Sequence, residues 1–328
     1  MPTSHKLNIL LIYPKHPWAT AYYLEKALRK KHHVETFDLF QTREYFHLAT
    51  RKRSLAFGKF TFNIPALSFT RKRKTTNILS IIKEKCKNRP DVIIEIDGIG
   101  LLHLEGYKNI DIPTVYYAID SHVKLEFQKY IASDFDYVFV AQKDYLEDFR
   151  KVTKNVFWLP LAANPEIWSY AQVPKYFDIG FVGSTDPRRG GQIYKRAELL
   201  TMLRQRYSVI AATCNPKDAA KVYNLCKIGF NRSMKGDLNM RVFEVMSCGT
   251  MLLTDRISNG LLDLFEDRKH LVTYKNEEEL DELVRYYLEN DDERERIALK
   301  GREEVHAKHT YDKRVEYMLR IMTEGREG

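Results

Sequence analysis

The sequence predicts an α/β protein with two domains, each built on a parallel sheet covered by helices. The chain has 328 residues, which is enough for two domains of ordinary size. Short apolar runs typical of buried strands alternate with helical stretches along its whole length. This alternation pauses at a proline-containing segment near residues 158–175 and then starts again. A composition of 44% hydrophobic and 30% charged residues is typical of a globular protein.

The first domain is expected to cover residues 1–170. Its predicted strands lie near residues 7–13, 34–39, 91–96, 112–119, 136–141 and 155–159, and its helices near 18–31, 76–88, 122–131 and 143–150. The opening apolar run is short, is interrupted by Asn8 and is followed by Pro14. We therefore interpret it as a buried strand and not as a signal peptide.

The second domain is expected to cover residues 171–309 and to repeat the same architecture. Its predicted strands lie near residues 176–184, 207–212, 227–231, 250–255 and 270–274. Its predicted helices lie near 190–206, 216–225, 240–248 and 277–289, with two further helices near 291–307 and 311–324. In both domains, the carboxyl ends of the strands are where a ligand is expected.

Cysteine content and hydropathy indicate a cytoplasmic protein. The four cysteines are far apart and include no C-x-x-C pair, which predicts reduced core thiols and no metal site. No apolar run approaches the 18 residues typical of a membrane-spanning helix.

Residues 51–74 carry most of the net charge. The chain has a net charge of +9, and this segment alone contains eight lysines and arginines and no acid. Four phenylalanines lie among these bases. The pattern suits an anionic membrane or a lipid-linked acceptor. It is also compatible with a nucleic acid whose bases stack on phenylalanine, or with an ordinary solvated loop.

The most informative segment, residues 227–255, predicts a strand, a polar loop, a short helix and a second strand. A helix that begins beyond the end of a parallel strand presents free N–H groups to an anion such as phosphate. Arg241 adds a positive charge there, and Glu244 follows on the same face, where its carboxylate could accept from two sugar hydroxyls. The pair indicates a nucleotide site, although an ordinary i,i+3 surface pair would have the same spacing.

This segment and the sequence after it resemble the CgeB-like (spore maturation protein) glycosyltransferases. The resemblance covers roughly residues 177–320 and is carried by the stretches 239–249, 252–255, 271–274 and 309–314. It implies a GT-B fold, in which two Rossmann-like domains face a central cleft. It also implies a nucleotide-diphosphate sugar as donor, and a last helix, residues 310–328, that crosses back to the first domain.

Other donor contacts follow from the resemblance. Gly183 and Ser184 come after a predicted strand, which by itself usually marks only a turn. Opposite the Arg241 helix they would form half of a pyrophosphate cradle, with Arg188 within reach. In related enzymes a glutamate at the position of Glu244 binds the nucleotide ribose.

One position departs from the family pattern. Many relatives carry a second glutamate eight residues before Glu244, where this chain has Gly236. This departure leaves the identity of the sugar and the stereochemical outcome open. Asn231 and Asn239 could supply neutral hydrogen bonds instead, or could serve as turn and helix-cap residues.

Candidates for the catalytic base lie at strand ends of the first domain. They are Asp97, Asp120 and His122, and we prefer Asp120 because it opens a helix at the expected cleft. Asp120 could also act only as a helix cap, Asp97 as a turn residue and His122 as a surface residue.

These observations predict a glycosyltransferase of the hexosyltransferase type. A nucleotide-diphosphate sugar would be the donor substrate, with no other cofactor and no metal, since arginine and a helix N-terminus can stabilise the departing diphosphate. The acceptor would be a glycan, a lipid-linked molecule or a protein, and the segment 51–74 would contact an anionic membrane surface. The alternatives are a non-catalytic surface or spore-coat assembly protein and a protein directed to nucleic acid.

Overall fold

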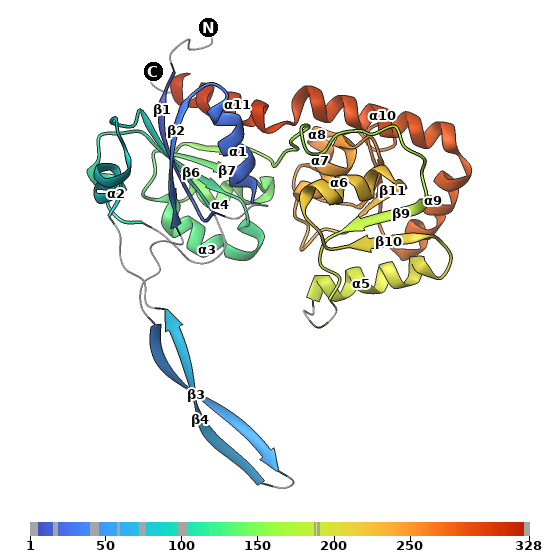
Figure 1. Cartoon of the computed structure of the whole chain (residues 1–328), viewed down its shortest axis with the longest axis horizontal. Coiled ribbons are helices and arrows are strands. Elements are labelled where there is room, and N and C mark those ends of the chain that lie inside the picture. The colour runs from blue at the N-terminus through green and yellow to red at the C-terminus, as the bar shows by residue number, and fades with distance from the viewer. Residues whose placement is uncertain are drawn as a thin grey trace.

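The computed structural model describes residues 6–15, 19–39, 46–57, 60–71, 77–97, 104–186, 188 and 191–324. Two parallel sheets covered by helices lie side by side, and a two-stranded antiparallel hairpin projects away from them (Figure 1). The predicted α/β fold with two Rossmann-like sheets is confirmed.

The first sheet has the strand order β2-β1-β5-β6-β7-β8, and all its pairs are parallel. The strands are β1 (Asn8–Tyr13), β2 (His33–Asp38), β5 (Val92–Ile96), β6 (Thr114–Ala118), β7 (Tyr137–Val140) and β8 (Val156–Trp158). The helices are α1 (Thr20–Arg29), α2 (Ile78–Lys85), α3 (Ser121–Ala132) and α4 (Leu146–Arg150), with short 3₁₀ turns η2 (Tyr107–Asn109) and η3 (Lys143–Tyr145). Successive residues of β1 enter two separate cores, so both faces of the sheet are covered and its strands are continuously apolar.

The second sheet has the order β10-β9-β11-β12-β13, again fully parallel. The strands are β9 (Phe177–Val182), β10 (Val209–Ala212), β11 (Cys226–Asn231), β12 (Met251–Asp255) and β13 (Val272–Tyr274). The helices are α5 (Gly191–Arg204), α6 (Pro216–Asn224), α7 (Met240–Ser247), α8 (Leu261–Leu264), α9 (Glu277–Glu289) and α10 (Asp291–Lys308). In each sheet the first strand lies between the second and the third, so the direction of winding reverses there, and ligands usually bind at the carboxyl ends around such a point.

The last helix, α11 (Tyr311–Glu324), packs on α1 of the first sheet (Figure 1). The rings of Tyr23 and Tyr311 stack with centroids 5.3 Å apart. Arg314 is buried and donates hydrogen bonds to the carbonyl oxygens of Pro160 (2.7 Å) and Leu161 (3.0 Å). The chain therefore returns to its first sheet after completing the second. The exact boundaries at residues 170 and 309 remain our proposed division.

The two sheets share one apolar core and a set of polar contacts. One buried cluster runs from β1 and α1 through α11 to Val242 and Phe243 of α7. On the polar side, Gln142 Oε1 accepts from the backbone N–H of Leu238 (2.8 Å), and Asn259 Oδ1 accepts from the N–H of Asp144 (3.0 Å). The first contact places the loop after β7 against the loop before α7, and the second joins Asp144 to the segment between β12 and α8.

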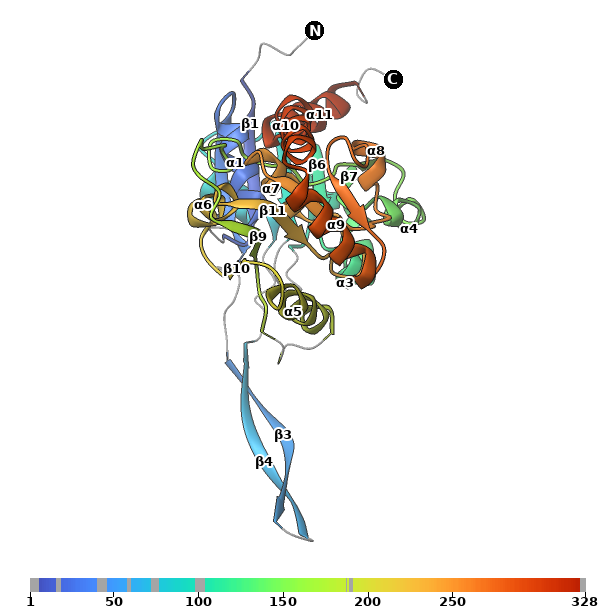
Figure 2. The same ribbon diagram turned by 90° about the vertical axis from the view of Figure 1, so that its right-hand side faces the viewer.

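The hairpin formed by β3 (Phe46–Phe57) and β4 (Phe60–Arg71) is the main element that the sequence did not predict (Figure 2). Its strands contain a run of bases and a proline, which hide the alternating pattern of a strand. The short helix α8 was also not predicted. The expectation of four core thiols was wrong, because Cys214 is exposed and Cys86 is only partly buried. Within the described residues, no helix is both long and apolar enough to cross a membrane.

The buried Arg314 yields a stability prediction. We expect Arg314→Ala to lower the free energy of unfolding by about 3 kcal/mol, because carbonyl oxygens of the 160–161 segment would lose their buried partner. Arg320→Ala on the same helix is the control and should change it by less than about 0.5 kcal/mol, since Arg320 is exposed. Urea unfolding measures both, and equal effects would contradict the anchoring role of Arg314.

Candidate active site

Arg241, in the first turn of α7, joins the carboxyl ends of two strands. Its Nε donates to the carbonyl oxygen of Val182 at the end of β9 (2.9 Å), and its Nη1 donates to Oδ1 of Asn231 at the end of β11 (2.7 Å). The guanidinium also lies 4.5 Å from the ring centroid of Phe181. Asn231 is fully buried and is oriented by its own donation to Thr254 Oγ1 (2.9 Å). The position of the guanidinium is therefore fixed from three sides.

Gly183 allows the Arg241 guanidinium to lie close to the backbone at the end of β9. Its φ of 150° is rare for residues with a side chain, and a Cβ there would lie 2.6 Å from Arg241 Nη2. Ser184 follows, and its carbonyl oxygen accepts from Arg196 Nη1 (3.2 Å). Among the residues that the structure describes, Arg241 Nη2 has no hydrogen-bond partner. The structure thus brings Gly183, Ser184, Asn231 and Arg241 together.

Sequence reasoning missed Arg196 of α5, which is buried and also lies over the Phe181 ring, 5.1 Å from its centroid. Its Nη2 donates to the carbonyl oxygen of Arg232 (3.0 Å). Burial and the nearby Arg241 lower the pKa of Arg196 to about 10. The sequence does contain a signal for Arg196. Its spacing from Ile193 and Leu200 places it on the buried side of α5, and a buried arginine usually has a structural or functional partner. Two guanidinium groups therefore create a positive potential at the end of β9.

Glu244 lies one turn after Arg241 and is only partly exposed. No hydrogen bond or ion pair joins the two side chains, so the alternative of an ordinary surface pair is wrong. Burial raises the pKa of the Glu244 carboxyl to about 8, and the charge of Arg241 opposes this shift. The pKa of Tyr23 is raised by burial and then by the Glu244 charge, which places the carboxyl beside α1. A partly buried carboxyl without a partner is costly and is common where a ligand binds.

The loop before α7 adds Asp237 and Asn239. Asn239 stands at the N-cap position of α7, but its side chain makes no capping hydrogen bond, and its buried Oδ1 has no partner in the part of the chain that the structure describes. Burial raises the pKa of Asp237, while His122 of the first sheet opposes the shift. His122 therefore lies close enough to Asp237 for its charge to act on that carboxyl. Among the described residues, its buried Nδ1 has no hydrogen-bond partner.

Asp97 and Asp120 follow neighbouring strands β5 and β6. The Asp97 side chain is 4% exposed and accepts a hydrogen bond from Gln128 Nε2 (2.6 Å). Lys124 Nζ lies 3.7 Å from a carboxylate oxygen of each aspartate. Burial raises the pKa of Asp97 to about 6, and Lys124 opposes this shift. Asp97 therefore holds the side chains of Gln128 and Lys124 inside the domain, and it is more than a turn residue.

Asp120 is the more accessible of the two carboxylates, with 46% of its side chain exposed. It stands at the N-cap position of α3 but makes no side-chain capping hydrogen bond. The alternative role as a helix cap therefore lacks the hydrogen bond that would define it.

Arg188 does not join the other predicted donor residues in this structure. Its side chain is 88% exposed and binds both carboxylate oxygens of Asp186 (2.8 and 2.9 Å). The exposed pair can exchange with solvent at little energetic cost. In this structure the Arg188 side chain is therefore paired with Asp186, and its role at the donor stays a prediction.

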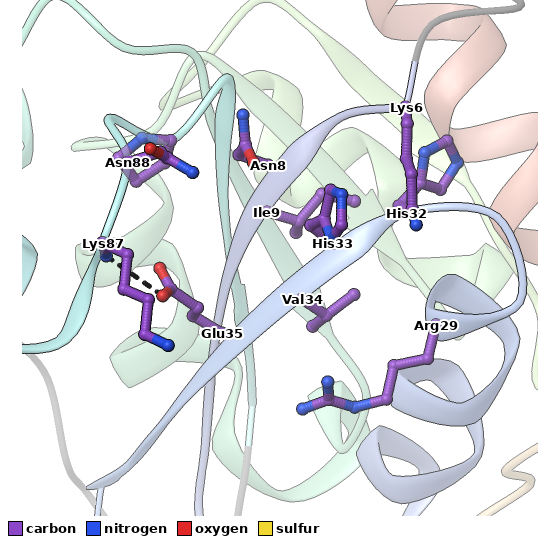
Figure 3. A pocket seen from close by; sticks show the side chains of 11 residues that line it. Lys6, Asn8, Ile9, Arg29, His32, His33, Val34, Glu35, Lys87 and Asn88 are labelled. Carbon is purple, nitrogen blue, oxygen red and sulfur yellow. Dashed lines mark hydrogen bonds between the residues drawn. The ribbon is translucent and has the colours of Figure 1, made fainter.

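A cavity of about 530 Å³ lies elsewhere, at the amino ends of β1 and β2 (Figure 3). Lys6, Asn8, His33 and Lys87 are among its lining residues, and the N–H of Lys87 donates to Glu35 Oε1 (3.0 Å). Because the candidate site residues follow the carboxyl ends of their strands, this cavity is separate from them.

Comparisons with known proteins bear on the family and the fold. Residues 188–320 match the sequence profile of the family described as glycosyl transferase-like. This match does not confirm the predicted membership of the CgeB-like branch. No curated protein sequence matches the chain.

Solved structures share the whole fold. Sucrose-phosphate synthase from Thermosynechococcus elongatus is 14% identical, with a TM-score of 0.61 over 97% of this chain and 99% of that one. A glycosyltransferase from Rickettsia africae is 12% identical, with a TM-score of 0.64 over 97% and 98%. Anabaena HepE in complex with UDP is 11% identical, with a TM-score of 0.61 over 97% and 100%. The chain therefore has the GT-B fold of these glycosyltransferases.

The contact between Gly183 and Arg241 can be tested. We expect Gly183→Ala to displace the guanidinium and to destabilise the protein by about 2 kcal/mol, because the added Cβ has no room. Gly191→Ala is the matched control: its φ is also positive, at 56°, but a Cβ there meets nothing within 4 Å. Thermal unfolding of both variants checks the prediction, which fails if the Gly191 variant is destabilised as much.

Proposed function

We propose that this protein transfers a sugar from a nucleotide-diphosphate donor to an acceptor hydroxyl. The observation that carries the proposal is the group formed by Gly183, Arg241 and Glu244, where a positive strand end and an unpartnered carboxyl lie one helical turn apart. The GT-B fold, the match of residues 188–320 to a glycosyl transferase-like family and the UDP complex of HepE support it.

The donor would bind to the second domain. The free N–H groups at the start of α7 and Arg241 Nη2 would contact the diphosphate, together with the backbone and hydroxyl of Ser184. Glu244 would accept hydrogen bonds from ribose hydroxyls, and Asn231 would act through Arg241, which it orients. Asn239 would offer its unpartnered Oδ1 to the sugar side of the donor. We propose that these positive groups stabilise the leaving diphosphate without a metal ion.

The first domain would supply the base. We assign Asp120 to the removal or orientation of the acceptor proton, because it is the accessible carboxylate of the pair. Asp97 would position Asp120 through Lys124, which lies 3.7 Å from both. His122, whose charge acts on Asp237, would line the sugar subsite.

The finer details are also proposals. We propose a hexose as the transferred sugar, membership of the CgeB-like branch, and a lipid-linked or cell-surface glycan as acceptor. The basic segment 51–74 supports an acceptor near an anionic surface and a peripheral position at the cytoplasmic membrane. A non-catalytic assembly role would predict the absence of sugar transfer with every donor.

Donor affinity tests the site directly. We expect Glu244→Ala and Arg241→Ala each to weaken nucleotide-sugar binding about 10- to 100-fold, since each removes a charge-assisted contact worth about 1.5–3 kcal/mol. The donor is first identified by thermal shift with UDP- and GDP-sugars, because a true donor stabilises the folded state. Calorimetry then compares the variants with Glu278→Ala on the exposed start of α9, which should bind like the unaltered protein. Unchanged affinity in both site variants would rule out this site.

Donor binding should also release a proton near neutral pH. The pKa of Glu244 is about 8 in the free protein, so its carboxyl is largely protonated at pH 7. Ribose hydroxyls that donate to the carboxylate favour the ionised form, so the pKa falls on binding and affinity rises as pH increases towards 8. Calorimetry in buffers with different ionisation enthalpies measures the released proton. Glu244→Gln should abolish it, whereas Asp97→Asn should not.

The same pKa gives an independent check without any ligand. Because the folded state holds this proton more tightly than the unfolded chain, the Glu244 carboxyl destabilises the fold as pH rises from about 4.5 to about 8. Glu244→Gln should therefore resist urea better than the unaltered protein above pH 8. Identical pH dependence of the two proteins would contradict the raised pKa.

A further inference from the structure

The loop between β11 and α7, residues 232–239, has a backbone conformation that other contacts must hold. Lys235 has a φ of 59° and Gly236 a φ of 77°, so two consecutive residues have the positive φ of the left-handed region. A lysine is disfavoured there because of its Cβ, and such a conformation persists only where the surrounding structure fixes it. The contacts that hold this loop therefore also decide the position of Asn239, which the proposed function places at the sugar side of the donor.

The first part of the loop is held from within the second domain. The backbone N–H of Ser233 donates to Asp255 Oδ1 (2.7 Å), and the N–H of Met234 donates to the carboxylate of Asp237. These contacts fix the start of the loop and close a turn within it. They leave the last part of the loop to other residues.

Two buried amide side chains hold this last part. Asn259 Nδ2 donates to the carbonyl oxygen of Gly236 (2.7 Å), and Gln142 Oε1 accepts from the N–H of Leu238 (2.8 Å). Each amide side chain belongs to a residue that is 2% exposed, so water has little access to replace these hydrogen bonds. One amide therefore fixes the carbonyl before Asp237, and the other fixes the N–H after it.

Both amides connect the loop to the first domain. Gln142 itself belongs to that domain, in the loop after β7. Asn259 belongs to the second domain, but its Oδ1 accepts from the N–H of Asp144 in the first (3.0 Å). The neighbouring Ser258 Oγ donates to the Asp144 carboxylate (2.6 Å). The shape of a loop in the second domain therefore depends on two side chains whose positions the first domain sets.

We propose that Gln142 and Asn259 are positioning residues for the sugar side of the donor site. They act through the 232–239 loop and hold Asn239 where it can reach the donor sugar. Arg241, by contrast, is held within the second domain by its own hydrogen bonds, so binding of the diphosphate does not require the two amides. The part of this inference that concerns the donor rests on the proposed function.

Two substitutions remove these contacts in different ways. Asn259→Asp keeps the size of the side chain and the acceptor for the Asp144 N–H, but it places a carboxylate oxygen against the carbonyl oxygen of Gly236. Gln142→Leu removes the acceptor for the Leu238 N–H without adding a charge.

Asn155→Asp is the matched control. Asn155 Nδ2 also donates to a backbone carbonyl oxygen, that of Asp136 (2.9 Å), but it precedes β8 and makes no printed contact with the loop. The control therefore adds the same charge and removes the same kind of hydrogen bond.

Hydrogen exchange of the Leu238 N–H tests the inference without any ligand. We expect exchange to become at least about ten-fold faster in Asn259→Asp and in Gln142→Leu, and to stay within about two-fold in Asn155→Asp. The N–H groups of β12 should stay protected in all three variants, because the sheet itself is unchanged. Unchanged exchange of Leu238 in both site variants would overturn the inference.

Calorimetry then separates positioning from general damage. The ligands are the nucleotide sugar identified by thermal shift and the corresponding nucleoside diphosphate. Asn259→Asp and Gln142→Leu should bind the nucleotide sugar about 5- to 10-fold more weakly and the diphosphate within about two-fold, since only the sugar side is displaced. Unchanged affinities, or equal losses for both ligands, would overturn the positioning role. If neither ligand binds to the unaltered protein, the proposed function fails, whereas the exchange of Leu238 still decides whether the two amides hold the loop.

Discussion

The geometry of the candidate site depends on where the Arg241 guanidinium is held. The group is partly buried, so it needs acceptors, and it finds them at the ends of β9 and β11. Asn231 can accept because Thr254 fixes its amide. The guanidinium can reach the carbonyl oxygen of Val182 because the next residue, Gly183, has no Cβ. One cation therefore sets the relative position of two strand ends and the first turn of α7. Any change in these partners moves the end of the helix at which an anion would bind.

The first sheet contains the opposite charge arrangement at its carboxyl ends. There a buried carboxylate, Asp97, is held by Gln128 and shares Lys124 with the more exposed Asp120. At the carboxyl ends of its strands, the second sheet instead has the guanidinium groups of Arg196 and Arg241. Transfer of a sugar from a diphosphate needs a carboxylate near the nucleophile and positive charge near the leaving group. In the function that we propose, the first sheet would supply the carboxylate and the second sheet the positive charge.

The sequence predicted those features that depend on local pattern. Apolar runs located every strand of the two parallel sheets, and the polar loop before residue 240 located the helix that carries Arg241 and Glu244. Contacts between distant segments were beyond its reach. Nothing local indicates that Arg196 packs on Phe181, that Gln128 binds Asp97, or that the charge of His122 acts on Asp237. Arg188 shows the opposite error. Its position in the sequence near Gly183 suggested a contact with the donor, but in the structure its side chain binds the nearby Asp186.

The junction between the sheets links the site to the arrangement of the domains. Its apolar side is a continuous core through α1, α11 and α7, and its polar side consists of hydrogen bonds from Gln142 and Asp144 to the segments around Leu238 and Asn259. Such hydrogen bonds each contribute only about 0.5–1.5 kcal/mol, whereas each buried aromatic or aliphatic side chain contributes about 1.5–3 kcal/mol. The polar side is therefore the weaker one, and it is the side that holds the loop containing Asp237 and Asn239. Any separation of the domains would begin by releasing this loop, so the shape of the donor site and the closure of the junction are physically coupled.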